Sequence, residues 1–408
     1  MGDKSAPLLS AEDVWARMRA AAVVVAQCEQ VALSDAPMRV LAEDLHATVT
    51  VPGFDNSAMD GYAFRAEEAR ERREMPISLR VAAGDSPGVL TSGTACRIFT
   101  GAPIPDGADT VVIQERCERR GDILVLPEKW TPYANIRRAG EDIREGDVVL
   151  RAGQRLTPQA VGLAASCGFA EIPVRRRLRV AIVSTGDELR AAGSGPLHKG
   201  QIYDSNRPML EALLRRLGCE VHALGALGDD LAATRQALRA AAGAADAIVT
   251  TGGVSVGEED HVKTALEAEG TLALWRVAIK PGKPLAFGRV GEAYFLGLPG
   301  NPVSAFVTYL LFVQPFLKAL MGEAQTGLQA FPVRAGFARA TPDSRREFVR
   351  ARLTVQDDGA VWAHAHARQG SGVLSSTVWA DGLVDIAAGR VVAEGDSVPF
   401  LPFGGLGC

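Results

Sequence analysis

Between residues 178 and 325 the chain alternates short apolar runs, rich in β-branched residues, with longer amphipathic segments. Residues 180–183, 219–227 and 247–250 have the composition of buried strands. Strands that alternate with helices indicate a parallel, doubly wound sheet. The other elements predicted here are helices over 208–217, 231–242, 262–269 and 303–320, and strands over 272–279, 285–287 and 293–298.

Clusters of glycine, proline and polar residues lie at the ends of these expected strands. Because the carboxyl ends of parallel strands meet at one edge of a sheet, we expect the clusters to form a single binding crevice. Glycine lets backbone N–H groups approach a ligand closely. The clusters are 184–188 (STGDE), 228–230 (GDD), 250–260 (TTGGVSVGEED), 280–284 (KPGKP) and 299–302 (PGNP).

The segment 247–261 permits two interpretations when it is considered alone. It is either a tight turn followed by a solvated acidic helix start, since acids favour helix N-termini, or a ligand-binding loop. The convergence of the other clusters on the same sheet edge favours the binding loop. Within it, Glu258 and Glu259 are expected only to cap the following helix.

Charged residues in the expected crevice indicate a phosphate or another tetrahedral oxyanion as ligand. Lys280 and Lys283 flank a stiff Pro-Gly turn that would hold their ammonium groups close together. Ammonium groups beside a glycine-rich backbone suit an oxyanion, and carboxylates beside phosphate usually bind a hard cation such as Mg²⁺. We therefore expect chemistry driven by positioning and charge neutralisation. The candidate carboxylates are Asp60, Glu188, Asp229 and Asp260.

Two loops outside this segment are further candidates. Residues 53–64 combine turn-forming residues with aromatic side chains, so this loop is expected to pack and to give Asp55 and Asp60 polar partners. Thr100 stands between an expected strand and a Gly/Pro kink. Its hydroxyl either faces a ligand or bonds its own backbone within the turn.

The flanking segments divide the chain into four expected domains. Residues 10–31 and 157–165 are predicted helices, the first capped by Ser10 and the second opened by Pro158. Residues 77–126 carry short β-like runs, and β patterns return after residue 333. The expected division is a segmented helical domain (1–45 with 146–177), an inserted β-rich domain (46–145), the α/β domain (178–325) and a C-terminal β-barrel (326–408).

Composition and missing motifs exclude several function classes. A net charge of −4 argues against a protein that binds nucleic acid by neutralising phosphates. The chain has no Walker loop, and its histidines lack the partner motifs of a catalytic triad. The six cysteines are scattered without Cys/His clusters, which excludes a typical zinc site and a disulfide framework. Without a signal peptide or an uninterrupted bilayer-spanning segment, a cytoplasmic location is expected.

Seven segments, in the same order, resemble the MoeA / gephyrin E-domain family, the molybdopterin molybdenumtransferases. They span nearly the whole chain, which makes the resemblance specific. The segments are 56–63 (NSAMDGYA), 99–105 (FTGAPIP), 184–189 (STGDEL), 203–206 (YDSN), 251–257 (TGGVSVG), 280–284 (KPGKP) and 298–304 (LPGNPVS).

The resemblance implies both a fold and a reaction. It implies four domains per subunit and an elongated homodimer, with the active cleft between the α/β domain of one subunit and the β module of the other. The implied reaction inserts molybdate into adenylylated molybdopterin and releases AMP, with Mg²⁺. The implied partners are the molybdopterin adenylyltransferase and molybdoenzyme-maturation proteins, with no nucleic acid and no membrane.

The resemblance also implies roles for individual residues. Asp229 and Asp260 would hold Mg²⁺ or orient phosphate, and Gly252, Gly253 and Ser255 would cradle the pterin-phosphate ligand. The implied catalytic residues are Asp60, Thr100, Glu188, Asp229 and Asp260. The implied oxyanion-binding residues are Lys280, Lys283, Arg345 and Ser371, and the other substrate-binding positions are Pro299, Gly300, Asn301, Pro302 and Ser304.

Two rival functions remain open at this point. The adenylyltransferase that makes the adenylylated pterin has a single domain that resembles residues 178–325. The flanking domains and the MDG and PGNP motifs favour metal insertion instead. A scaffold like the gephyrin E domain is the non-enzymatic rival, and the absence of a long linker from the sequence argues against it.

Overall fold

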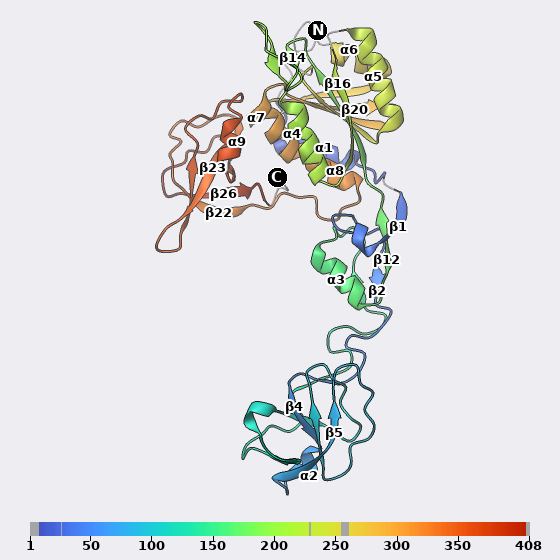
Figure 1. The fold of residues 1–408 in the computed structure, drawn as a ribbon. Helices are drawn as coiled ribbons and strands as arrows, with labels where there is room; N and C mark the ends of the chain where they lie inside the picture. Colours follow the sequence, from blue (N-terminus) through green and yellow to red (C-terminus); the bar gives the residue numbers. More distant parts are fainter. Residues whose placement is uncertain (1–7, 26, 228–229, 254–260, 405–408) are drawn as a thin grey trace.

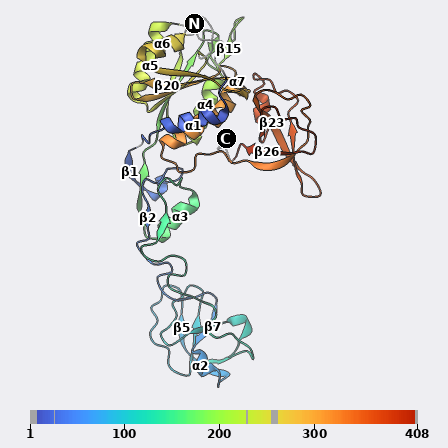
Figure 2. The same ribbon diagram turned by 180° about the vertical axis from the view of Figure 1, so that it is seen from behind.

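The computed structural model describes residues 8–25, 27–227, 230–253 and 261–404. The described chain is elongated (Figures 1 and 2). The α/β domain lies at one end and the inserted β module at the other, with the small segmented domain between them. The C-terminal barrel lies beside the α/β domain. The α/β domain and the β module are therefore far apart within one chain.

The α/β domain is built on a six-stranded sheet. The first four strands run parallel, whereas β20 is antiparallel to both of its neighbours, β21 and β18. The predicted parallel, doubly wound arrangement holds for the first four strands and for β18, whereas β20 runs antiparallel because residues 277–283 are too few for the crossover that parallel neighbours need. In sheet order the strands are β16 (Glu220–Leu227), β13 (Arg179–Thr185), β17 (Ala247–Thr251), β21 (Ala293–Leu298), β20 (Pro284–Val290) and β18 (Gly270–Arg276).

Helices cover both faces of this sheet, as a doubly wound domain requires. On one face, α5 (Leu231–Ala244) and α6 (His261–Glu269) pack over Ala181, Val183 and Ile248. The other face carries Val180, Ile182 and Val249. The helices on that face are α4 (Asn206–Arg216) and a continuous helix made of α7 (Pro302–Thr308), the π-helical η3 (Tyr309–Val313) and α8 (Gln314–Leu320). Successive side chains of β13 and β17 therefore lie in two separate apolar layers, one on each face of the sheet.

The continuous helix over 302–320 is predominantly apolar. Its 19 residues would suffice for a bilayer span by length and composition, although Gln314-Pro315 and Lys318 interrupt its apolar run, so that no bilayer span is expected. In the structure 83% of its most apolar window is buried inside the protein. Its apolar surface is therefore used by the core of the α/β domain.

The N-terminal helix differs from the prediction in length and in position. Helix α1 (Ala11–Ala21) begins at the predicted cap, where the Ser10 side chain accepts the N–H of Asp13, but it ends ten residues early. Residues 23–25 are three consecutive valines, which are poor helix formers, and the chain then enters strand β1 (Cys28–Ala32). Val14 and Met18 pack into the core of the α/β domain rather than into the segmented domain. The indole of Trp15 donates to the Leu311 carbonyl at 2.6 Å, within the π-helical turn.

The segmented domain joins two distant pieces of the chain. Helix α3 (Pro158–Ser166) is capped by the Thr157 side chain and packs on a small core with Leu41, Leu45 and Ile172. Pairs of strands, more than helices, hold the two pieces of the chain together, so the domain is less helical than predicted. Its other elements are β1 paired with β12 (Glu171–Arg175), β2 (Leu45–His46) paired with β11 (Val148–Leu150), and η1 (Leu33–Asp35).

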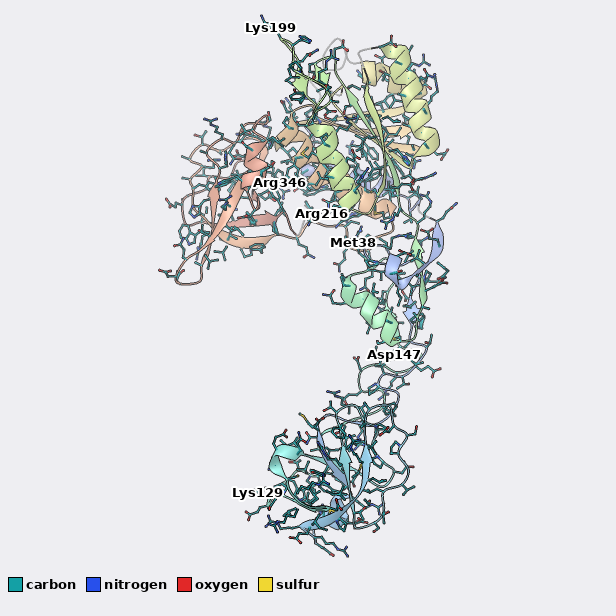
Figure 3. All side chains as sticks on the ribbon, in the orientation of Figure 1. Met38, Lys129, Asp147, Lys199, Arg216 and Arg346 are labelled. Carbon is teal, nitrogen blue, oxygen red and sulfur yellow. The ribbon has the colours of Figure 1, made fainter. Side chains whose placement is uncertain are left out.

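The inserted module is β-rich, as predicted. Its main sheet contains six strands, in the order β7 (Thr110–Ile113), β4 (Gly61–Phe64), β6 (Ala95–Ile98), β5 (Glu74–Val81), β9 (Ile123–Val125) and β8 (Glu118–Arg120). Short β3 (Asn56–Ser57) pairs with β10 (Ile136–Arg137), and the helical turns are α2 (Ala66–Ala69) and η2 (Gln114–Arg116). Lys129 lies in this module and Asp147 near its junction with the segmented domain (Figure 3).

The C-terminal domain closes into a barrel, as predicted. Pairing of β23 with β25 joins the two ends of a five-strand run, and β19 adds to its edge. Closure removes the exposed sheet edges that an open sandwich would leave. The elements are β19 (Ile279–Lys280), β22 (Phe331–Ala335), β23 (Arg346–Val355), β24 (Val361–Ala365), α9 (Ser375–Trp379), β25 (Gly382–Ile386) and β26 (Ser397–Pro402).

Candidate active site

A cavity of about 970 Å³ lies at the carboxyl edge of the α/β sheet and reaches the barrel. Most of the residues that the sequence assigned to substrate binding line this cavity. The edge rule for parallel strands therefore predicted the position of the crevice. The predicted residues that line it are Glu188, Gly252, Gly253, Lys280, Lys283, Pro299, Gly300, Asn301, Pro302, Ser304, Arg345 and Ser371.

The antiparallel strand β20 explains how the Lys280–Lys283 turn reaches this edge. Strand β18 runs in the same direction as the parallel strands, so it ends at the carboxyl edge. The turn follows there, and β20 returns from it in the opposite direction. Both lysines consequently line the same cavity as the loops that follow β13, β17 and β21.

Glycine is required where β17 ends. Gly252 has φ +85, and a Cβ there would lie 2.8 Å from the carbonyl oxygen of Thr185. A Cβ on Gly253, with φ +64, would lie 2.4 Å from Val262. The two glycines thus allow the ends of β13 and β17 to approach closely and leave backbone at the cavity wall.

The three cations of the cavity differ in their partners. Lys280 lies 3.2 Å from Asp343 and 3.4 Å from Glu347, and Arg345 lies 3.3 Å from Asp343. Burial raises the pKa of Asp343, but hydrogen bonds from Arg345 and Lys280 outweigh it and hold that pKa at about 2. Among the described residues, no carboxylate forms an ion pair with Lys283. Two of the expected oxyanion-binding cations are therefore already partly neutralised.

A loop of the barrel forms one wall of the cavity. The N–H of Val303, at the start of α7, donates to the Ser371 carbonyl at 3.0 Å and links this loop to the α/β domain. Behind the loop, the buried Arg350 donates to the Gly370 carbonyl at 3.2 Å and to Ser376 Oγ at 3.1 Å. Burial lowers the pKa of Arg350 to about 10, so it stays charged at neutral pH.

The Arg350 support was not predicted from the sequence. Val349 and Ala351 lie in the barrel core, so the alternation of strand side chains predicts that Arg350 faces away from this core. No local pattern shows that another segment covers the guanidinium group and buries it.

Asp204 and Asn206 also line the cavity, although no role was assigned to them. The Asn206 amide donates to Thr251 Oγ1 and to the Gly300 carbonyl, each at 2.7 Å, which fixes its orientation. Asp204 Oδ1 accepts the N–H of Arg207 at 3.0 Å. Both side chains are buried, and the 203–206 motif had already marked them.

Asp60 and Thr100 do not line this cavity but lie in the inserted β module. Thr100 donates its backbone N–H and its hydroxyl to Asp60 Oδ1, each at 2.8 Å. The N–H and then the hydroxyl lower the pKa of the Asp60 carboxyl. The Thr100 hydroxyl therefore bonds another residue's side chain rather than its own turn; Thr100 is exposed, and Asp60 is half-buried.

The packed loop around Asp60 is only partly as predicted. Tyr62 and Phe64 are buried, whereas Phe54 and Met59 are 52% and 46% exposed. Asp55 accepts Arg138 at 2.6 Å and the N–H of Ala139 at 2.8 Å, so it joins two segments of the module.

Several predicted residues lie outside the described ranges: Asp229, Ser255, Glu258, Glu259 and Asp260. Within the described ranges, no group of three His, Cys, Asp or Glu side chains could hold a metal ion. The described carboxylates therefore form no such group, and Glu188 and Asp204 are the two carboxylates among the described residues that line the cavity.

The middle domain defines the class of protein. Residues 181–319 match a family model described as a probable molybdopterin binding domain. Residues 9–168 match the MoeA N-terminal region (domain I and II), and residues 332–403 match the MoeA C-terminal region (domain IV).

Whole proteins agree with these matches. The chain is 41% identical over 381 residues to the molybdopterin molybdenumtransferase of Haemophilus influenzae, covering 92% of this chain and 94% of that one. It is 39% identical over 363 residues to that of Synechococcus elongatus, covering 86% and 88%. The crystal structure of the molybdopterin biosynthesis moeA protein of Pyrococcus horikoshii OT3 matches with a TM-score of 0.82 at 29% identity, covering 97% and 100%. The chain belongs to the molybdopterin molybdenumtransferase (MoeA) family.

Proposed function

We propose that this protein inserts molybdate into adenylylated molybdopterin and releases AMP, as a step of molybdenum cofactor biosynthesis. The observation that carries the proposal is the cavity of about 970 Å³, which is lined by glycine backbone and three cations. It occurs in a chain whose three family matches together extend from residue 9 to residue 403. A volume of this size suits a pterin nucleotide together with a small oxyanion.

The cations define the oxyanion end of the proposed site. Lys283 meets the incoming molybdate first, because no described carboxylate competes for its ammonium group. Lys280 and Arg345 form ion pairs with Asp343, and each gives up part of this contact when it binds the anion. Ser371, on the barrel loop, adds a hydroxyl at the same wall. The backbone of Gly252 and Gly253 then faces the phosphates of the pterin nucleotide.

Asp60 and Thr100 enter the proposed site from a second subunit. Their module lies at one end of the chain, whereas Lys199, on the loop between β14 (Leu189–Arg190) and β15 (Ile202–Tyr203), marks the opposite end (Figure 3). Ile202 and Tyr203 of that segment line the cavity. The exposed Phe54 and Met59 near Asp60 offer apolar surface for a partner. An antiparallel homodimer would bring each module to the partner's cavity.

Mg²⁺ is part of the proposal only through Asp229 and Asp260, because the described carboxylates form no cluster. Bound there, it would neutralise phosphate charge. Asp60, held ionised by Thr100, and Glu188 position the substrate or accept a proton. The protein acts in the cytoplasm and contacts the adenylyltransferase that supplies its substrate.

A mixed dimer tests the shared site. Chains with Asp60→Asn and chains with Lys283→Ala are co-expressed with different tags, and the heterodimer is isolated. Each parent homodimer should release little AMP in the presence of molybdate. The heterodimer should recover about half of the wild-type rate, because one of its two sites combines two unaltered contributions. A heterodimer as slow as both parents would contradict a site built from two subunits.

The adenylyltransferase remains the rival enzyme. Matches on both sides of the middle domain favour metal insertion, since the rival needs that domain alone. Incubation of the pure protein with ATP and molybdopterin separates the two, because only the rival forms adenylylate without molybdate. Formation of adenylylate at a catalytic rate would favour the rival.

A further inference from the structure

Arg97 lies behind the Asp60–Thr100 pair and has no role in the reaction as described so far. It is a half-buried residue of strand β6, which pairs with the strand that follows Asp60. Within the described ranges no carboxylate forms an ion pair with it. A half-buried guanidinium group without a carboxylate partner must satisfy its donors on other groups.

Those donors converge on the residues next to the pair. Nη1 of Arg97 donates to the Gly61 carbonyl at 2.8 Å and to the Ile98 carbonyl at 3.0 Å, and Nη2 donates to Gln114 Oε1. Gly61 directly follows Asp60 in the chain. The N–H of Gln114 in turn donates to the Asp60 carbonyl at 3.0 Å.

Aromatic rings fix the plane of the same guanidinium group. The Arg97 Cζ atom lies 4.4 Å from the ring centroid of Phe99 and 5.3 Å from that of Tyr62. Phe99 directly precedes Thr100, and Tyr62 is the second residue after Asp60. One side chain therefore contacts the chain beside both members of the pair.

We propose that Arg97 is a positioning residue that holds Asp60 and Thr100 in the arrangement in which they meet the substrate. This inference rests on the proposed function, because it assumes that the Asp60–Thr100 pair takes part in the reaction. The Arg97 charge also lowers the pKa of Asp60, after the hydrogen bonds from Thr100. Lysine cannot replace Arg97 fully, since a single ammonium group lacks the planar fork that reaches three acceptors and stacks on rings.

Arg80 provides a matched control. Its Cζ atom lies 4.7 Å from the Phe99 ring centroid, so it shares the aromatic contact of Arg97. Within the described ranges it makes no hydrogen bond to the residues around Asp60. Arg80→Met therefore removes a neighbouring cation without removing the support of the pair.

The test measures molybdate-dependent AMP release for Arg97→Met, Arg97→Lys, Arg80→Met, Asp60→Asn and the double variant Asp60→Asn/Arg97→Met. Arg97→Met should lower kcat by about 10- to 100-fold with KM changed by less than about threefold, because small displacements of a reacting group cost this much. Arg97→Lys should recover part of kcat, and Arg80→Met should match the wild type. The double variant should be no slower than Asp60→Asn, because Arg97 acts through Asp60.

The possible failures are distinguishable. A wild-type rate for Asp60→Asn would overturn the role of Asp60 in the proposed function. A slow Asp60→Asn with a wild-type rate for Arg97→Met would overturn only the inference about Arg97. Additive losses in the double variant would also overturn it, because a merely structural effect of Arg97 would add to the loss of the carboxylate.

Discussion

Thr100 donates both its backbone N–H and its hydroxyl to the same oxygen of Asp60, Oδ1, at 2.8 Å each. Within the described ranges, Oδ2 of Asp60 receives no hydrogen bond. One oxygen of the carboxylate is thus held by the module, and the other has no described hydrogen-bond partner within the chain. The two hydrogen bonds lower the pKa of the Asp60 carboxyl and fix its orientation.

Thr100→Val should remove one of the two donors to Asp60 and keep the backbone donor. The pKa of Asp60 lies below its usual 3.8 in the wild type, so the variant should move it upward. The acid limb of the kcat/KM profile for AMP release should therefore shift to higher pH. At neutral pH a loss of about tenfold is expected, as for a hydrogen bond to a charged group.

Thr100→Ser serves as the control, because it retains the hydroxyl. It should keep the wild-type acid limb. An unchanged acid limb in Thr100→Val would show that the hydroxyl does not set the ionisation of a group used in the reaction.

The two lysines of the cavity should respond differently to alanine substitution. Lys283→Ala should raise KM for molybdate by about 10- to 100-fold and leave thermal stability unchanged, because no described carboxylate depends on its charge. Lys280→Ala should raise KM less, since Lys280 is already shared with Asp343 and Glu347. It should also lower stability by less than about 1 kcal/mol, because the side chain is 41% exposed.

Molybdate titrations at low and high ionic strength, with thermal unfolding of each variant, check this difference. The effect of Lys283→Ala should shrink as salt screens the remaining cations. Equal increases in KM for the two variants would contradict the idea that the ion pairs of Lys280 weaken its contact with the anion.

Arg350→Met should loosen the barrel loop that carries Ser371. The substitution removes donors to the Gly370 carbonyl and to Ser376 Oγ; because Ser376 is buried, losing its donor should cost about 1–3 kcal/mol. Thermal unfolding should show this loss of stability. KM for molybdate should rise, because the loosened loop no longer holds Ser371 at the cavity wall. Arg352→Met, at an exposed position two residues further along the same strand, is the control; it removes a surface hydrogen bond to the Trp379 carbonyl and should cost less stability than Arg350→Met. Equal stability of the two variants would contradict the support role of Arg350.

The sequence predicted the position of the cavity well because one rule governs it. Loops that follow parallel strands meet at a single edge, so Gly252, Lys283 and Pro299 were placed together without knowledge of any contact. The rule holds even though β20 is antiparallel. Strand β18 ends at the carboxyl edge and β20 begins there, so the turn between them lies at the same edge as the other loops.

Contacts between distant segments could not be predicted in this way. Asp343, which neutralises Lys280, comes from the barrel, and no local pattern links the two. Asp60 and Thr100 were both marked by their loops, yet their hydrogen bonds depend on the pairing of β4 with β6 across 40 residues of sequence. The end of α1 was missed for a local reason, because the apolar stripe continues into valines that favour extended backbone.

Asp246 gives a prediction about stability and pH. Its side chain is only 8% exposed and accepts hydrogen bonds from Arg176 at 2.8 Å and from Arg179 at 3.1 Å, where the segmented domain joins the α/β sheet. Burial raises the pKa of Asp246, but these hydrogen bonds outweigh it and lower the pKa from 3.8 to about 2. A carboxyl with a lowered folded pKa stabilises the protein fully above its unfolded pKa and loses that contribution as pH falls through its folded pKa. The shift corresponds to about 2 kcal/mol.

Asp246→Asn should therefore destabilise the protein by about 2 kcal/mol or more at pH 7, and the difference from the wild type should shrink between about pH 4 and pH 2. Thermal unfolding of both proteins across this range measures it. Asp122→Asn is the control, because the Asp122 side chain is 91% exposed beside Arg119 and should contribute nothing measurable. If the stability difference between Asp246→Asn and the wild type stayed constant from pH 7 to pH 2, the loss would come from the shape or packing of the asparagine side chain. The ionised carboxylate would then not be what ties the segmented domain to the sheet.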